Sequence, residues 1–429
     1  MSPSATARPS LGDPPQLSPD RLLPSKSLPN TTNGTTTPDL DASLLRFTPT
    51  TTPRPVPLPN SPEVASQSTC TDHMITSAWT AHAGWSAPHL QPYAPLTLSP
   101  TASVLHYSTS CFEGLKAYRG HDGRLRLFRP DRNCARMLAS AARVTLPAFD
   151  PAELEKLIKA LVRVEGPKWV PPARPGAFIY IRPTLIATHP ALGMQPPKEA
   201  LLFIIACFLP SLDDPRALPT PAPTPTPTPT KPPAATGLKL LASPPTATRA
   251  WPTGFGASKI GANYGPSLPQ HSHAQSRGYD QVLWLFGPDH LVTEAGASNF
   301  FVVWRARPER GGRVEMVTAA LDMGLILAGV TRGCVLELAR ARLGGEGVAV
   351  VERAFGMREV VEAVEEGRVV EAFAAGTAGR DLDIPVPGAG GYAARIKAWL
   401  GDIMFGRVEH EWGVVVDEDI EEEEETGGA

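Results

Sequence analysis

The chain has 429 residues and a formal net charge of −3 at pH 7, which gives no electrostatic case for nucleic acid as a partner. An apolar content of 42% is enough for a sizeable hydrophobic core, and the length predicts two or three domains. The five cysteines show no CxxC or other metal-ligand spacing, so no metal site is expected, and they are typical of reduced thiols in an intracellular protein.

Residues 1–61 are rich in Pro, Ser and Thr and poor in aromatic residues. Such a segment cannot bury enough surface to offset the entropy of ordering, so we expect a mostly disordered N-terminal extension. It lacks the apolar stretch of a secretory signal. Arg8 suits a mitochondrial transit peptide, but Asp13, Pro14 and Pro15 oppose the amphipathic helix that such peptides form. We therefore expect a cytoplasmic protein, with the mitochondrion as the alternative.

Residues 62–210 are expected to form a small N-terminal α/β domain. A β-hairpin is predicted at 115–127, where a Gly-His-Asp-Gly turn separates two apolar stretches. A helix is predicted from about residue 131, because apolar residues recur on one of its faces. Arg136 lies on another face of that helix, where the pattern by itself favours a solvated basic surface.

The remaining elements of this domain are an amphipathic helix at 151–163 and strands at 178–182 and 201–208. The longest apolar run, 200–210, is too short to cross a bilayer and indicates a buried strand, so no membrane partner is expected. Arg182 ends the first strand and needs a partner, because an unpaired buried charge is costly. A structural ion pair and a bound ligand are both consistent with this need.

Alternating proline and threonine mark residues 211–236 as an extended tether at a domain junction. Residues 237–416 are expected to form a larger, cofactor-binding C-terminal domain. Its predicted elements are four strands and a closing helix, at 281–286, 291–293, 300–304, 369–374 and 392–405. Thr331 is expected to cap another helix, whose glycine-preceded N-terminus suits a phosphate group. Residues 417–429 are mostly acidic and predict a disordered tail.

Lys259 stands among glycines and other small residues, five positions before Tyr264. Glycines let other groups approach the backbone closely, and a lysine packed in such a place loses water. Desolvation lowers the pKa of an amine and makes it a usable nucleophile toward a carbonyl group. A surface lysine in a glycine loop is the alternative interpretation, and the stretch is not a P-loop because no Gly-Lys-Ser/Thr sequence is present.

Seven short motifs along the chain help to decide between these two interpretations of Lys259. In chain order they are LHY at 105–107, FEG at 112–114, YIRP at 180–183, SKIGANYG at 258–265, VTEAGASN at 292–299, GVTR at 329–332 and GTA at 376–378. Together they resemble the branched-chain amino acid aminotransferases, which are pyridoxal-phosphate enzymes of fold type IV. The resemblance implies a mixed α/β fold of two domains with the cofactor at their interface. It also implies a homodimer, because loops of one subunit usually complete the other's pocket.

The resemblance assigns the cofactor-binding residues. Lys259 matches the lysine that binds pyridoxal 5′-phosphate covalently and then moves the proton during catalysis. Glu294 matches the carboxylate that faces the pyridine nitrogen, and Tyr264 matches the tyrosine near the cofactor's phenolic oxygen. The residues that match the phosphate site are Arg136, Val330, Thr331 and Thr377.

The implied substrate site is an apolar pocket that holds one charge. Its walls match Tyr107, Phe112 and Tyr180, for which ordinary core packing is the alternative. Arg182 matches the arginine that binds the side-chain carboxylate of glutamate, and the backbone N–H groups of Thr377 and Ala378 match the α-carboxylate site. The implied reaction is reversible amino transfer between leucine, isoleucine or valine and 2-oxoglutarate, as in branched-chain amino acid biosynthesis.

The chain departs from the family pattern mainly on the substrate side. Ala297 replaces a threonine, Cys70 stands where an aromatic residue is common, and 379–383 carries charges where some animal members have CxxC. A same-fold paralogue acting on another hydrophobic amino acid in a specialised pathway is therefore the first alternative. A lyase or D-amino acid transaminase is opposed by the YIRP and FEG motifs, and a catalytically silent scaffold is opposed by the intact cofactor set.

Overall fold

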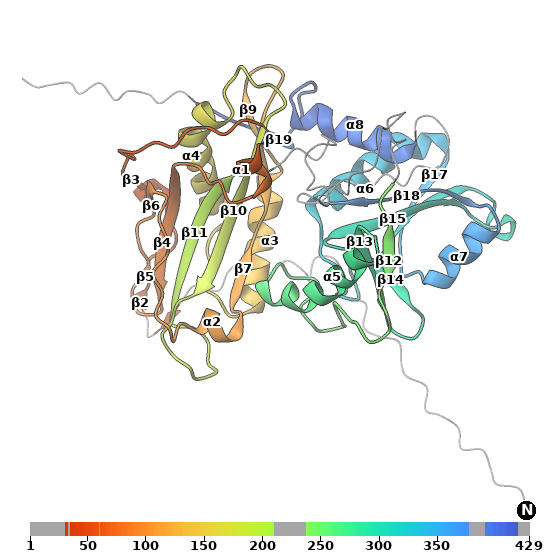
Figure 1. The fold of residues 1–429 in the computed structure, drawn as a ribbon, viewed down its shortest axis with the longest axis horizontal. Helices are drawn as coiled ribbons and strands as arrows, with labels where there is room; N and C mark the ends of the chain where they lie inside the picture. Colours follow the sequence, from red (N-terminus) through yellow and green to blue (C-terminus); the bar gives the residue numbers. More distant parts are fainter. Residues whose placement is uncertain (1–30, 33–34, 60, 210–236, 377–390, 419–429) are drawn as a thin grey trace, which may run out of the picture.

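The computed structural model describes residues 31–32, 35–59, 61–209, 237–376 and 391–418. These residues form two lobes, each built on a sheet with helices packed against it (Figure 1). The first lobe is drawn from red to yellow and the second from green to blue, with the C-terminal strand returning to the first. Within the described ranges, no helix combines the length and apolar content that crossing a membrane demands.

The first sheet has the order β19-β9-β8-β10-β11-β4-β6-β3, with β5 paired to β4 and β7 paired to β10. Its strands are β3 (Arg46–Phe47), β4 (His73–Thr80), β5 (Gly84–Trp85), β6 (His89–Pro92), β7 (Ser110–Phe112), β8 (Leu115–Arg119), β9 (Leu125–Phe128), β10 (Phe178–Ala187), β11 (Glu199–Cys207) and β19 (Gly413–Val416). The helices of this lobe are α1 (Pro62–Ala65), α2 (Ser103–Tyr107), α3 (Pro130–Arg143) and α4 (Pro151–Trp169). A separate short pair, β1 (Thr31–Thr32) and β2 (Thr35–Thr36), precedes them.

The core of the first lobe lies between its sheet and α4. Leu154, Leu157 and Leu161 recur at helical spacing on α4, and each is fully buried in the main apolar cluster. Burying one such side chain contributes about 1.5–3 kcal/mol, so this face accounts for why α4 stays docked. Pro151 begins the helix and Asp150 caps it, with the carboxylate accepting a hydrogen bond from the N–H of Ala152.

The second sheet has the order β12-β13-β14-β15-β16-β17, and β18 also pairs with β15. Its strands are β12 (Leu240–Ala242), β13 (Gln281–Phe286), β14 (Leu291–Ala295), β15 (Ser298–Arg305), β16 (Val314–Thr318), β17 (Val348–Glu352) and β18 (Val369–Ala375). The helices of this lobe are α5 (Leu268–Ser276), α6 (Val330–Leu343), α7 (Met357–Glu365) and α8 (Tyr392–Met404). Phe301 and Phe373 stack across β15 and β18, with ring centroids 4.8 Å apart, inside the cluster that joins α6 and α8 to the sheet.

Most predicted elements are confirmed, several of them longer than expected. The predicted hairpin is β8–β9, whose antiparallel register includes Ala117 opposite Leu127. The helix expected from residue 131 is α3, and the helix expected at 151–163 is α4, which continues to Trp169. The strands β10, β11, β13, β14, β15 and β18 and the closing helix α8 all occupy the expected positions.

The expected cap of α6 is wrong. Gly329, not Thr331, occupies the N-cap position, and Thr331 is the second residue of the helix. The backbone of Gly329 is extended, with φ −63° and ψ 131°, and no side chain caps the helix there. The first turn of α6 therefore starts from bare backbone, which is the arrangement that leaves N–H groups for a ligand.

The expected chain ends also differ from the structure. Leu40 is 1% exposed and β3 pairs in parallel with β6, so this part of the segment 1–61 belongs to the first lobe. At the other end, Glu418 of the acidic segment 417–429 binds the fully buried guanidinium of Arg119, with Nη2 to Oε1 at 2.7 Å. We propose that the first domain begins before residue 40 and includes β19.

Candidate active site

Helix α3 reaches from the first lobe to the Lys259 loop of the second. The hydroxyl of Ser140 accepts a hydrogen bond from the backbone N–H of Lys259 at 2.9 Å. One turn further, Arg143 donates to the carbonyl of Thr253 at 2.8 Å. From β7, the N–H of Phe112 donates to the carbonyl of Lys259 at 3.1 Å. The main chain at Lys259 is thus fixed on both its polar groups by the other lobe.

The side chain of Lys259 is half-buried among groups that change its charge. Its ammonium nitrogen Nζ lies 3.3 Å from the hydroxyl of Tyr264 and 5.0 Å from the ring centroid of Phe112. Burial lowers the pKa of Lys259, Glu113 opposes this by raising it, and the positive charge of Arg136 lowers it further. The net effect lowers the pKa of Lys259 and favours the neutral amine, which is the form that the sequence predicts for a nucleophilic lysine.

Arg136 and Glu113 form a buried, two-point ion pair beside this loop. The Nε and Nη2 atoms of Arg136 donate to the two oxygens of Glu113 at 2.7 and 2.8 Å, and Glu113 is 1% exposed. Burial by itself raises the pKa of Glu113, but the charge and hydrogen bonds of Arg136 outweigh it, so the pKa is lowered. The remaining nitrogen of Arg136, Nη1, donates to the carbonyl of Ala328 at 2.9 Å, just before α6.

Glu294, at the end of β14, is a buried carboxylate with three partners. Oε1 accepts from the N–H of Leu327 at 2.9 Å and from the side-chain amide of Asn299 at 3.2 Å. Oε2 lies 2.8 Å from Nη2 of Arg249. Burial raises the pKa of Glu294, while Arg249 and the hydrogen bond from Leu327 pull it back down.

Arg249 was not singled out from the sequence, because it belongs to none of the motifs. Its loop, between β12 and the Lys259 segment, holds no other charged residue from 240 to 258. A lone arginine in an uncharged stretch that leads into a binding loop is the signal that could have identified it. It also donates to the carbonyl of Leu325 at 2.9 Å, which holds it against the segment that precedes α6.

Phe112, Tyr180 and Arg182 come together next to Lys259. The guanidinium carbon of Arg182 lies 4.6 Å from the ring centroid of Phe112 and 5.1 Å from that of Tyr180. Its Nη2 donates to the hydroxyl of Tyr180 at 2.9 Å, while its buried Nε has no hydrogen-bond partner among the described residues. A Cβ at Gly114 would lie 1.9 Å from the same hydroxyl, so Tyr180 fits only against a glycine.

Three further sets of predicted residues are Tyr107, Val330 with Thr331, and Thr377 with Ala378. Tyr107, at the end of α2, is 43% exposed, and its hydroxyl donates to the carbonyl of Leu192. Thr377 and Ala378 lie outside the described residues. Val330 and Thr331 form the first turn of α6, and a Cβ at Gly329 would lie only 2.1 Å from the side-chain oxygen of Asn299. Close packing there depends on glycine at the position before the helix.

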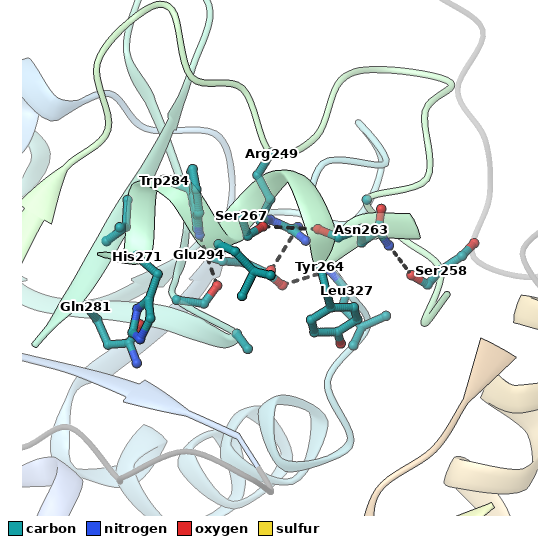
Figure 2. Close-up of a pocket in the computed structure, with 15 residues that line it drawn as sticks. Arg249, Ser258, Asn263, Tyr264, Ser267, His271, Gln281, Trp284, Glu294 and Leu327 are labelled. Carbon is teal, nitrogen blue, oxygen red and sulfur yellow. Dashed lines mark hydrogen bonds and ion pairs between the residues drawn. The ribbon is translucent and has the colours of Figure 1, made fainter. Parts of the chain in front are cut away.

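A cavity of about 220 Å³ opens beside Glu294 and Tyr264. Figure 2 shows these two side chains and Leu327 on one side of it, with residues of α5 and β13 on the other. Residues that line it include Arg249, Tyr264, His271, Gln281, Glu294 and Leu327. Ala297, which replaces the threonine expected from the resemblance, lines the same cavity, so the missing hydroxyl leaves this wall less polar.

Comparisons with known proteins identify relatives of this chain. A family model described as "Amino-transferase class IV" matches residues 110–366. The cytosolic branched-chain-amino-acid aminotransferase of Saccharomyces cerevisiae is 42% identical over 395 residues, which cover 88% of this chain and 98% of the relative. The mitochondrial branched-chain-amino-acid aminotransferase of Rattus norvegicus is 41% identical over 373 residues, covering 84% of this chain and 88% of the relative.

Solved structures share the fold. A branched-chain aminotransferase from Thermoproteus uzoniensis, solved with norvaline, matches with a TM-score of 0.59 at 22% identity, covering 80% of this chain and 99% of that one. The branched-chain amino acid aminotransferase of Thermobaculum terrenum in its PLP form matches with a TM-score of 0.58 at 22% identity, covering 80% and 98%. The predicted two-lobed mixed fold is therefore confirmed.

Proposed function

The chain belongs to the class IV aminotransferases and, within them, to the branched-chain amino acid aminotransferases, and from this premise we propose what each part of its site does. It is a pyridoxal-phosphate-dependent aminotransferase, and we propose that it exchanges the amino group of leucine, isoleucine or valine with 2-oxoglutarate. The observation that carries the assignment of the site is the desolvated Lys259, with Nζ 3.3 Å from the Tyr264 hydroxyl, next to the buried carboxylate of Glu294.

The residues around the cavity fit the cofactor that the family uses. Pyridoxal phosphate supplies an aldehyde that takes up the amino group and a pyridinium ring that withdraws electrons from the substrate Cα. Lys259 would hold its aldehyde carbon. Glu294 would hold the pyridine nitrogen, because a buried anion favours its protonated form. Tyr264 would donate to the phenolic oxygen, and Arg136, Val330, Thr331 and Thr377 would hold the phosphate.

Lys259 is also proposed to move the proton during amino transfer. Its pKa is lowered, so a larger share of the amine is neutral near pH 7 and can accept a proton from the substrate Cα. The hydroxyl of Tyr264, 3.3 Å from Nζ, orients that amine. The backbone anchors from Ser140 and Phe112 keep its position fixed while the side chain alternates between two partners.

The substrate pocket is proposed to combine an aromatic wall with one cation. Phe112, Tyr180 and, from an exposed position, Tyr107 supply apolar surface for a branched side chain. Arg182 donates one hydrogen bond to Tyr180, and its buried Nε has no hydrogen-bond partner among the described residues, so the guanidinium can donate to the side-chain carboxylate of glutamate or 2-oxoglutarate. Thr377 and Ala378 are proposed to bind the α-carboxylate through their backbone N–H groups.

A homodimer and a cytosolic location complete the proposal. Tyr107 sits in an exposed apolar patch with Leu105, Leu192 and Met194, which are 58%, 57% and 92% exposed. A second copy of the chain covering this patch would bring Tyr107 into an apolar site. Relatives include both cytosolic and mitochondrial forms, so imaging of the tagged protein tests the cytosolic location against the mitochondrial alternative. Light scattering tests the dimer.

The experiment that tests the function is a visible absorption spectrum of the cofactor-loaded protein during titration with leucine and then 2-oxoglutarate. We expect a cofactor band that leucine abolishes and 2-oxoglutarate restores. Lys259→Ala should lose this cycle, whereas Lys156→Ala, an exposed lysine on α4, should keep it. A cofactor band that does not change with leucine but changes with another hydrophobic amino acid would support the paralogue. The replacement of threonine by Ala297 in the cavity wall is the observation that favours this alternative. Absence of any band would favour the silent scaffold.

A further inference from the structure

Two cysteines face each other across neighbouring strands in the first lobe. Cys207 ends β11, and Cys70, just before β4, forms an isolated antiparallel bridge with it. One backbone hydrogen bond flanks the bridge on each side: the N–H of Thr71 donates to the carbonyl of Ala206 at 2.9 Å, and the N–H of Phe208 donates to the carbonyl of Thr69 at 3.0 Å. This pattern defines a non-hydrogen-bonded pair, in which opposite side chains approach most closely and the Cα atoms lie about 4.5 Å apart. That separation lies within the span of about 4.4–6.8 Å that a disulfide bridges.

The Cys70–Cys207 pair packs against Tyr180, which is a wall residue of the candidate substrate pocket. Tyr180 on β10 is the register partner of Cys207 on the opposite side of β11. Cys70, Cys207 and Tyr180 accordingly belong to one small buried cluster, separate from the main core. Figure 1 shows β4, β11 and β10 side by side in this order, as the sheet order requires. A change at the sulfur atoms is therefore transmitted to Tyr180 by direct packing.

The two thiols differ from the other cysteines of the chain. Cys70 and Cys207 are 6% and 9% exposed, whereas Cys111, Cys134 and Cys334 are 0–1% exposed and have no cysteine opposite them in the described strands. All five are free thiols in the structure. Cys70 and Cys207 are therefore the cysteines that lie opposite each other, and they are also more exposed to solvent than the other three.

We propose that Cys70 and Cys207 form a disulfide site whose closure by a small external disulfide reshapes the wall of the substrate pocket at Tyr180. One thiol, as its thiolate, attacks a sulfur of the external disulfide and releases one small thiol. The second cysteine then attacks this mixed disulfide, forms the Cys70–Cys207 bond and releases the other small thiol. The protein loses two hydrogen atoms, and the reagent is reduced to two thiols. The kinetic effect rests on the proposed function, but the bond itself does not.

The surroundings make this reaction slow. Burial raises the pKa of the Cys207 thiol to about 11, with Cys70 adding to the rise and Arg182 opposing it. Burial also raises the pKa of Cys70, against a hydrogen bond with Tyr93 and the charge of Arg54. At neutral pH both sulfurs are mainly protonated, so the site responds to prolonged oxidising conditions and not to brief exposure.

The test exposes the cofactor-loaded protein to 2-hydroxyethyl disulfide, a small neutral reagent without an amine that could react with the cofactor. After hours of incubation, thiol titration under denaturing conditions should show a fall from five free thiols to three. Non-reducing peptide mapping should join the Cys70 and Cys207 peptides, with the other three cysteines free as internal controls. Cys70→Ser and Cys207→Ser should each prevent this crosslink.

Kinetics then test the effect on the pocket. Closure should raise the KM for leucine about threefold to tenfold with a smaller change in kcat, because the contacts at Tyr180 serve binding. A thiol reductant should reverse the change, and the kinetics of Cys70→Ser should not respond to the reagent. Absence of the Cys70–Cys207 peptide would overturn the site, and a crosslink with unchanged KM would overturn its effect on the pocket. Reduced protein inactive on every amino acid would overturn the proposed function, while peptide mapping still decides whether the bond forms.

Discussion

Replacing Arg249 with alanine should weaken the site without touching any residue of the family motifs. Nη2 of Arg249 lies 2.8 Å from Glu294, and the two side chains are 10% and 4% exposed. Removing one partner of a buried ion pair leaves the other charge uncompensated and costs about 3–5 kcal/mol. Glu294 responds by taking up a proton more readily, because burial already raises its pKa and Arg249 is the main opposing charge. In its proposed role, a protonated Glu294 would no longer stabilise a protonated pyridine nitrogen.

The expected result is a fall in kcat of tenfold or more, since about 1.4 kcal/mol corresponds to a factor of ten in rate. The stability difference between wild type and variant should depend on pH in a defined direction. A carboxyl group whose folded pKa is raised binds more protons in the folded than in the unfolded state, so its contribution to stability declines as the pH rises through that range. Removing Arg249 raises the pKa of Glu294 further, so the variant should lose the most stability near neutral pH and the least in acid.

Arg353→Ala is the matched control. Arg353 binds Glu359 through two hydrogen bonds of 3.0 and 2.8 Å, as a similar paired contact, but the two side chains are 28% and 42% exposed. Exposed pairs of this kind contribute about 0–1 kcal/mol. Thermal unfolding and kcat, both measured from pH 5 to 8, separate the two variants. If Arg249→Ala matched Arg353→Ala in both, the buried pair would have no role in the site.

Three further predictions concern the anchors and walls of the site. Ser140→Ala leaves the N–H of Lys259 without its 2.9 Å acceptor and should weaken cofactor binding by about 1–3 kcal/mol, which absorbance titration with pyridoxal phosphate measures. Arg182→Leu should raise the KM for 2-oxoglutarate about tenfold and leave that for leucine nearly unchanged; an equal rise for both would contradict its role as the carboxylate partner. Gly114→Ala places a Cβ 1.9 Å from the Tyr180 hydroxyl, so KM should rise for both substrates while the visible cofactor band persists.

The sequence predicted local features well because local features depend on neighbouring residues. The hairpin β8–β9 follows from a glycine turn between apolar stretches, and α4 follows from leucines at helical spacing. Lys259 and Glu294 were predicted as site residues because their motifs resemble those of a known family. Their setting in the structure, a desolvated lysine and a buried carboxylate, agrees with the chemistry assigned to them.

Features that depend on distant segments could not be predicted in this way. Leu40 has no periodic neighbours that would mark it as a core residue, but it is 1% exposed and belongs to the main apolar cluster of the first lobe. The acidic tail was expected to be disordered, but Glu418 pairs with the guanidinium of Arg119, which is fully buried. The ion pair of Arg249 could not be predicted for the same reason, because its partner Glu294 lies on another element of the second lobe.

The arrangement of the anchors explains why the site requires both lobes. The second lobe contributes Lys259, Tyr264 and Glu294, but the backbone of Lys259 is held by Ser140 and Phe112 of the first. Arg136 makes a second link, because its two-point pairing with Glu113 fixes the planar guanidinium while Nη1 reaches the carbonyl before α6. In its proposed role, Lys259 alternates between cofactor and substrate, which requires a rigid main chain with a mobile side chain. Either lobe by itself would supply the reactive groups or their supports but not both, so separation of the lobes should abolish cofactor binding before it unfolds either sheet.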